Sequence, residues 1–255
     1  MPKTYATGAF PSPPDERDYR LAAAAPVMLP AKYMTKPPPV IDQGYIGNCV
    51  AQACCYVSRA VYDKLFSPNW LYGRRKETGY QGPGWYIREA LKTMLHEGNV
   101  PDEQYAALEV KEVIRWVATR EKELLKKAAP FTIDAFARLS TAAEIKQALY
   151  DGLLVVFLAN ITTYEVDADG IYHSTTNNHG CHAMSVWGWQ DNLFRVLNSW
   201  GPDWGDGGMC WMHATDVLRL NDVWAIADSP NDLIQKPEPE KEEKTVRESK
   251  YVTGV

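Results

Sequence analysis

The hydrophobic pattern of this 255-residue chain changes its period near Pro130. Before this proline, long apolar runs follow helical spacing, and after it short apolar runs are separated by glycine, asparagine and aspartate. Helices followed by strands are typical of an α+β protein in which the two kinds of element are segregated. We therefore expect two lobes, one helical and one built on a twisted antiparallel sheet, with a cleft between them.

Three helices are predicted in the first half. The first begins near Asn48 and covers residues 49–62, which are apolar on most faces, as in a buried helix. The second covers residues 85–96 and ends before Gly98, a favoured residue just past a helix end. The third begins at residue 101 or 102 and runs to 128, with an apolar stripe at helical spacing.

The second half is predicted to contain one short helix and several strands. Thr141 and Glu144 form a capping-box pattern for a helix that ends before Gly152. Strands are predicted at residues 153–159, 183–189, 194–197 and 209–213.

The predicted lobes lie between two terminal segments of different composition. Residues 1–40 are a proline-rich N-terminal arm that is either laid over the domain surface or free. Residues 41–135 are assigned to the helical lobe and residues 136–230 to the β lobe. Residues 231–255 form a charged tail that we expect to be disordered, because it cannot bury enough apolar surface to offset its ordering entropy.

Composition excludes several classes of function. The net charge is −5 and no clustered basic face is evident, so no nucleic-acid partner is expected. The most apolar run, residues 153–159, is far shorter than the roughly 20 residues of a membrane-spanning helix, and residues 1–8 lack the apolar core of a signal peptide. The five cysteines are irregularly spaced without Cys-x-x-Cys, which predicts free thiols in a reducing, cytoplasmic compartment and no zinc site.

One of these thiols, Cys49, is predicted to lie in the first turn of a buried helix. The partial positive charge of a helix N-terminus favours the thiolate, which is the reactive form. Gln43, six residues upstream, could direct its side-chain amide to the same place and complete an oxyanion hole. Taken alone, however, Cys49 is better interpreted as a small core residue, because buried free cysteine is common.

A base and an orienting group are found further along the chain. His182 begins an apolar strand, where a histidine can lie at a lobe boundary, and it follows Cys49 by 133 residues. Asn198 follows His182 by 16 residues, in a loop rich in glycine and tryptophan, and could fix the tautomer of an imidazole. Each residue alone has a structural interpretation: an ordinary histidine at a strand end, and a tryptophan-packed turn.

Taken together, the segments resemble the papain-like cysteine peptidases over about residues 40–215. The spacing matches the known pattern of these enzymes, in which histidine and asparagine follow the nucleophile by about 130–150 residues. The segments that carry the resemblance are Gln43-Gly-x-x-Gly47-x-Cys49, Tyr80-Gln-Gly-Pro-Gly84, Gly170-Ile-Tyr172, Gly180-Cys-His182-Ala183 and Asn198-Ser-Trp200-Gly-x-x-Trp204-Gly-x-x-Gly208.

The resemblance implies a cysteine-type peptidase that acts on an extended peptide or protein through a thioester, without metal or organic cofactor. Cys49 would be the nucleophile and His182 its base, with the oxyanion held by Gln43 and the Cys49 amide. Asn198 would orient His182 under the cover of Trp200.

The substrate cleft that the resemblance implies has two further residues. Gly84 and Ala183 are expected to line it, together with Trp200.

Several positions depart from the family pattern. Val50 replaces an aromatic residue, Ile46 replaces a disulfide-forming cysteine, and Cys181 replaces the Asp or Asn that often precedes the histidine. The segment before Gln43 is too short for the long inhibitory propeptide of the lysosomal members and resembles that of bacterial and viral members. Activity is therefore expected to be controlled in another way, or to be absent.

Two alternatives remain open at this stage. The fold could be a catalytically silent module that docks into a larger assembly, such as a viral particle, through its arm or tail. The same thioester chemistry could also serve a transferase or a deamidase, because acyl transfer and hydrolysis differ only in the acceptor.

Overall fold

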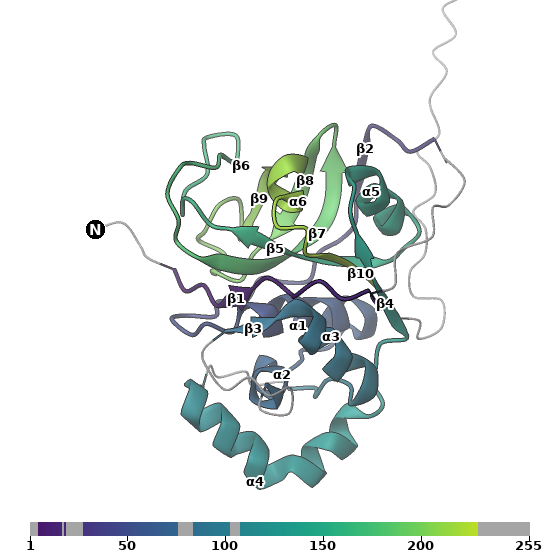
Figure 1. The fold of residues 1–255 in the computed structure, drawn as a ribbon, viewed down its shortest axis with the longest axis vertical. Helices are drawn as coiled ribbons and strands as arrows, with labels where there is room; N and C mark the ends of the chain where they lie inside the picture. Colours follow the sequence, from purple (N-terminus) through teal and green to yellow (C-terminus); the bar gives the residue numbers. More distant parts are fainter. Residues whose placement is uncertain (1–4, 17, 19–27, 76–83, 103–107, 229–255) are drawn as a thin grey trace, which may run out of the picture.

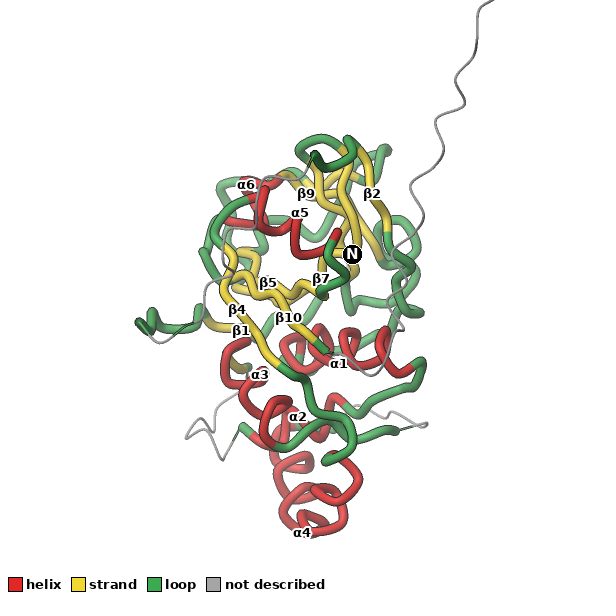
Figure 2. The backbone as a smooth tube through the Cα atoms, turned by 90° about the vertical axis from the view of Figure 1, so that its right-hand side faces the viewer, coloured by secondary structure: helices red, strands yellow, loops and turns green. Residues whose placement is uncertain are grey.

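A lobe of strands lies over a lobe of helices, as Figure 1 shows, in the computed structural model. The structure describes residues 5–16, 18, 28–75, 84–102 and 108–228. The α+β class with two lobes is therefore confirmed. Figure 2 shows the same division from the side, with the long helices gathered below the sheet.

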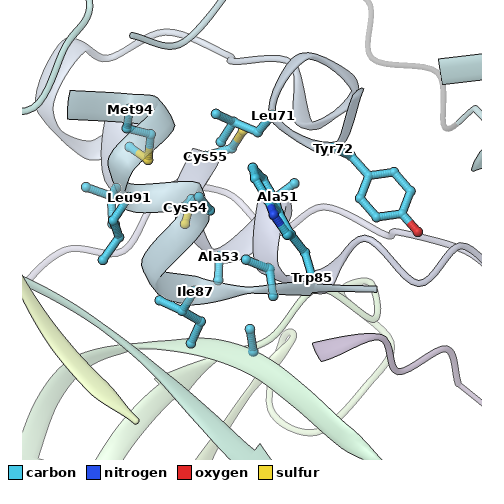
Figure 3. Packing of buried hydrophobic residues seen from close by; sticks show 14 of the residues in the cluster. Ala51, Ala53, Cys54, Cys55, Leu71, Tyr72, Trp85, Ile87, Leu91 and Met94 are labelled. Carbon is cyan, nitrogen blue, oxygen red and sulfur yellow. The ribbon is translucent and has the colours of Figure 1, made fainter. Parts of the chain in front are cut away.

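In the described part of the helical lobe, there are four helices and one short strand. These elements are α1 (Cys49–Tyr62), α2 (Pro68–Arg74), β3 (Trp85–Tyr86), α3 (Ile87–His96) and α4 (Val110–Ala128). The predicted first helix is α1, and all but three of its residues are buried, as its apolar faces indicate. Figure 3 shows Cys54 and Cys55 of α1 packed among Leu71, Trp85 and Leu91 of the neighbouring elements.

The β lobe contains seven strands and two short helices among the described residues. They are β4 (Ala135–Leu139), α5 (Ala142–Tyr150), β5 (Leu154–Asn160), β6 (Ile171–Tyr172), β7 (Cys181–Gln190), β8 (Leu193–Leu197), β9 (Met209–His213), α6 (Ala214–Leu218) and β10 (Val223–Ala227). The strand order is β4-β10-β5-β7-β8-β9-β6, and the neighbours are antiparallel except β6 and β9. The strand β7 lies in the middle of this order and packs against α1 of the helical lobe.

The residues of the N-terminal arm that the structure describes contribute two further strands. β2 (Lys32–Met34) pairs antiparallel with β7, and Tyr33 stacks on Trp189 with ring centroids 4.7 Å apart. β1 (Ala9–Phe10) lies between the lobes in Figure 1. It pairs in parallel with β3 of the helical lobe and antiparallel with Cys181 of β7.

The structure corrects some of the predicted elements. The third helix begins at Val110, not at residue 101 or 102, because Pro101 forms a bridge with Phe66 and a capping box between Glu109 and Glu112 starts α4. β3 takes the first two residues of the predicted second helix. The helix α2 and the strands β4 and β10 were not predicted, because they are short and their pattern shows no distinct period.

The capping box of α5 was predicted and is present. The Thr141 side chain accepts a hydrogen bond from the Glu144 amide at 3.1 Å, and the Glu144 carboxylate accepts one from the Thr141 amide at 3.2 Å. We expect Thr141→Ala to lower the free energy of unfolding by about 1 kcal/mol, because the helix loses one cap. Urea denaturation measures the loss. As a control, Thr119→Ala in the exposed middle of α4 should cost nothing, since alanine is the better helix former.

No helix within the described ranges combines the length and apolar character needed to cross a membrane.

Candidate active site

Cys49 is the first residue of α1 and is fully buried. Burial raises the pKa of its thiol to about 12, and backbone hydrogen bonds from Ala183 and Gly8 lower that pKa by smaller amounts. The thiol therefore lies beside β7, next to the residue that follows His182, and beside the N-terminal arm. Both lobes and the arm meet at this sulfur.

His182 and Asn198 are joined by a hydrogen bond, with 2.7 Å between His182 Nε2 and Asn198 Oδ1. The same oxygen accepts the backbone N–H of Ser199 at 2.7 Å, so the atom that faces the ring must be the amide oxygen. Nε2 therefore donates, and Nδ1 of the neutral ring is left with its lone pair. Nδ1 is buried and has no hydrogen-bond partner within the described part of the chain.

The environment of the imidazole is apolar. Trp200 lies against the ring, with centroids 4.5 Å apart. Burial lowers the pKa of His182 to about 4, and the hydrogen bond to Asn198 opposes this shift. In this conformation, the site therefore holds a neutral imidazole and a neutral thiol rather than an ion pair.

Gln43 is buried and fixed at both ends of its amide. Its Oε1 accepts the Ser199 hydroxyl at 2.5 Å, which orients Nε2 as the donor group. Nε2 donates to the carbonyl of Ile46 at 2.8 Å and to the carbonyl of Ala6 at 3.3 Å. The predicted oxyanion donor thus contacts a backbone carbonyl of the arm.

Residues 5–10 of the arm, named here the cleft segment, run between the lobes beside the other predicted site residues. The Gly8 amide donates to the carbonyl of Cys181 in β7 at 3.2 Å, and the Gly8 carbonyl accepts from the amide of Trp85 in β3 at 2.9 Å. Gly84 packs so closely that a Cβ on it would lie 2.6 Å from the Gly8 carbonyl oxygen. A strand thus joins the two lobes by main-chain hydrogen bonds and packs against Gly84.

Three residues beside the site were missed from sequence. Tyr5 and Tyr164 pack on Trp200, and His179 stacks on Tyr164, although these residues are far from one another or from Trp200 in the chain. No local pattern marks them, because the contacts depend on how distant loops fold together. The segment Tyr80–Pro83 of the predicted cleft edge lies outside the described residues.

Metal-ligating side chains are not clustered near the site. In the residues that the structure describes, no group of three or more His, Cys, Asp or Glu could hold a metal ion.

The two-lobed fold is similar to that of solved cysteine proteases, and the family model that matches the chain is one of cysteine peptidases, a class of hydrolase. The family model described as papain family cysteine protease matches residues 73–225. The chain therefore belongs to the papain family of cysteine proteases, as its sequence motifs predicted. The matched range contains His182 and Asn198, and Cys49 lies before it.

Relatives and solved structures agree with this assignment. An uncharacterized peptidase C1-like protein of Acanthamoeba polyphaga mimivirus is 28% identical over 228 residues, 78% of this chain and 73% of the relative. Macrodontain-1 of Ananas macrodontes is 24% identical over 200 residues, 75% of this chain and 90% of the relative.

The fold itself is similar to two solved cysteine proteases. Xylellain from Xylella fastidiosa superimposes with a TM-score of 0.73 at 23% identity, over 90% of this chain and 99% of that one. The Carica candamarcensis protease CMS1MS2 superimposes with a TM-score of 0.59 at 18% identity, over 79% of this chain and all of that one.

Proposed function

We propose that the chain hydrolyses peptide bonds in peptide or protein substrates through a thioester on Cys49. Two observations together support this: Cys49 lies at the N-terminus of α1 beside β7, and His182 has its Nδ1 lone pair free while Nε2 donates to Asn198. A thiol, an imidazole and an amide that orients the imidazole are the groups that catalyse nucleophilic acyl transfer in cysteine hydrolases.

The reaction has two halves. Transfer of the thiol proton to His182 gives the thiolate, whose sulfur bonds to the peptide carbonyl carbon. The C–N bond then breaks, and the amine leaves with the proton from His182. Water, deprotonated by the same imidazole, attacks the thioester, releases the acid and restores the thiol.

The charge that forms on the carbonyl oxygen needs donors in both halves. The backbone N–H of Cys49 lies at the start of α1, where helix amides lack intrahelical partners. The Gln43 Nε2 group already donates to a carbonyl, that of Ala6. We assign these two groups to the oxyanion, Asn198 to the orientation of His182, and Trp200 to the exclusion of water from their hydrogen bond.

Release of the cleft segment is the step that makes the site reactive in this proposal. Burial is the main reason for the raised thiol pKa and the lowered imidazole pKa. Water that enters when residues 5–10 leave removes this cause and favours the thiolate–imidazolium pair.

Thiol labelling tests the proposal directly. An epoxide of the E-64 type, the compound in the Carica candamarcensis protease structure, is added at mildly acidic pH and the label is mapped by mass spectrometry. We expect labelling at Cys49 and about 100-fold slower labelling in His182→Ala, because a histidine base contributes about 10²–10⁴-fold. Cys210→Ala is the control, since Cys210 is equally buried but lies in β9 and not at the N-terminus of α1. Equal labelling of all five cysteines would contradict the proposal.

A catalytically silent module is the second candidate function. One observation favours it: Cys49 and His182 are both fully buried beneath the cleft segment. The labelling experiment separates the two candidates, because a silent module has no preferentially reactive thiol.

A further inference from the structure

On the His182–Asn198 side of the cleft segment, aromatic rings pack around Trp200. The ring of Tyr164 stacks on His179 with centroids 4.6 Å apart and meets Trp200 edge to face at 5.7 Å. Trp204 holds this group in place, because its indole N–H donates to the Tyr164 carbonyl at 2.8 Å and its ring packs on Trp200 at 5.3 Å. We name Tyr164, His179 and Trp200 the aromatic platform.

Tyr5 of the chain itself lies on this platform. Its ring is stacked on Trp200, with centroids 4.8 Å apart and planes 15° apart, and is tilted toward Tyr164 at 5.8 Å. The carbonyl of the next residue, Ala6, accepts the Trp200 indole N–H at 3.0 Å and the Gln43 amide at 3.3 Å. An aromatic side chain and the carbonyl that follows it are therefore both bound.

The rest of the cleft segment is bound through main-chain atoms. Gly8 bonds to Cys181 and Trp85 on the two lobes, and Thr7 donates its hydroxyl to the His179 carbonyl at 3.2 Å. Main-chain bonds of this kind give affinity to any extended peptide, whereas the pockets for side chains give selectivity. Within the segment, the Tyr5 ring packs on Trp200 beside His182, whereas the Phe10 ring is tilted against Tyr86 of the helical lobe, with centroids 5.8 Å apart.

We propose that the aromatic platform is a subsite selective for an aromatic side chain, and that Tyr5 is the occupant which the chain itself supplies. The selectivity of this subsite for substrates rests on the function proposed above. A peptide substrate must displace residues 5–10, and a peptide with an aromatic side chain on the aromatic platform competes best with Tyr5. The ligand class is thus an extended peptide with an aromatic residue on the His182–Asn198 side of Cys49.

The occupant is tethered just beyond the cleft. The Ser12 amide donates to the Asp222 carboxylate at 2.8 Å, and Asp18 forms ion pairs with Arg88 and Arg138. A ligand tethered by a short segment has an effective concentration on the order of millimolar. A free peptide that binds no better than the cleft segment therefore cannot displace it at micromolar concentration.

The first test measures access to Cys49 by its rate of alkylation with iodoacetamide in the full chain. Tyr5→Ala should raise that rate about 10-fold, because it favours release of the cleft segment. Loss of one stacked aromatic pair changes the equilibrium constant of this release by about 2- to 12-fold, and Tyr5 contacts two rings. Tyr45→Ala is the matched control, since Tyr45 is 90% exposed, and should leave the rate unchanged. An unchanged rate in a folded Tyr5→Ala chain would overturn the proposal.

The second test uses two acetylated hexapeptides as ligands for the Tyr5→Ala chain. One has the sequence of residues 5–10, Tyr-Ala-Thr-Gly-Ala-Phe, and the other has alanine in place of the tyrosine. The tyrosine peptide should protect Cys49 from alkylation at about 10-fold lower concentration, and Tyr164→Ala should abolish that difference. Equal protection by the two peptides would overturn the subsite.

Neither readout requires turnover. A chain that shows both differences but hydrolyses no peptide would contradict the proposed function and leave the subsite standing. A chain that hydrolyses peptides but shows neither difference would overturn the subsite alone.

Discussion

Cys49→Ala is expected to abolish peptide hydrolysis. The thiol forms and breaks the bond to the substrate, so its removal should lower kcat by about four to six orders of magnitude, as in other catalytic triads. The fold should survive, because alanine fits the space and the helix-forming preference of the first turn of α1. Hydrolysis of a fluorogenic peptide library measures the effect.

Two comparisons make this result interpretable. Cys210→Ala removes an equally buried thiol from β9 and should keep full activity. Cys49→Ala and Cys210→Ala are also made in the Tyr5→Ala background. This comparison distinguishes activity lost because the nucleophile is missing from activity that is low because residues 5–10 close the cleft. Activity retained in Cys49→Ala, in either background, would contradict the assignment of the nucleophile.

Among glycine-to-alanine substitutions at the described glycines, Gly98→Ala should produce the largest loss of stability. Gly98 has φ +81°, and a Cβ there would lie 2.1 Å from the Ala128 carbonyl oxygen and 3.1 Å from that of Phe131. Its own carbonyl accepts the indole N–H of buried Trp70 at 2.9 Å, so the backbone cannot move away freely. Left-handed strain and the clash together should cost about 3 kcal/mol or more, or about 6–12 °C in Tm.

Gly207→Ala is the control for this prediction. Gly207 has φ +61°, and a Cβ there meets nothing within 4 Å. Its substitution should therefore cost only the left-handed strain, about 1–2 kcal/mol. Equal losses of Tm in the two variants would show that the backbone around Gly98 relaxes and that the clash carries no cost.

The local sequence was sufficient to predict the helices and strands that have a distinct hydrophobic period or a helix cap. The buried run from Cys49 predicted α1, the Thr141–Glu144 pair predicted the start of α5, and the apolar run before Asn160 predicted β5. The strands β4 and β10 were missed because each is stabilised by its pairing with the other and with β5, which the sequence of a short segment does not reveal.

The residues of the candidate site were also predicted from the sequence, whereas several of their contacts were not. Spacing and motif singled out Cys49, His182, Asn198 and Gln43, and the structure adds the hydrogen bonds that orient the last three. Occupation of the cleft by residues 5–10 was not predicted. The stacking of Tyr5 on Trp200 joins residues 195 positions apart, and no periodicity connects such distant parts of a chain.

The Asp222 carboxylate has a consequence for how the cleft opens and closes. It is 1% exposed and holds the Ser12 amide while it also accepts the indole N–H of Trp224 at 2.6 Å. The arm is thereby fixed to the sheet immediately after the cleft segment. Closure is then a first-order process within one molecule, and the fraction of closed clefts stays the same when the protein is diluted. A cleft filled by the arm of a second chain would instead open on dilution.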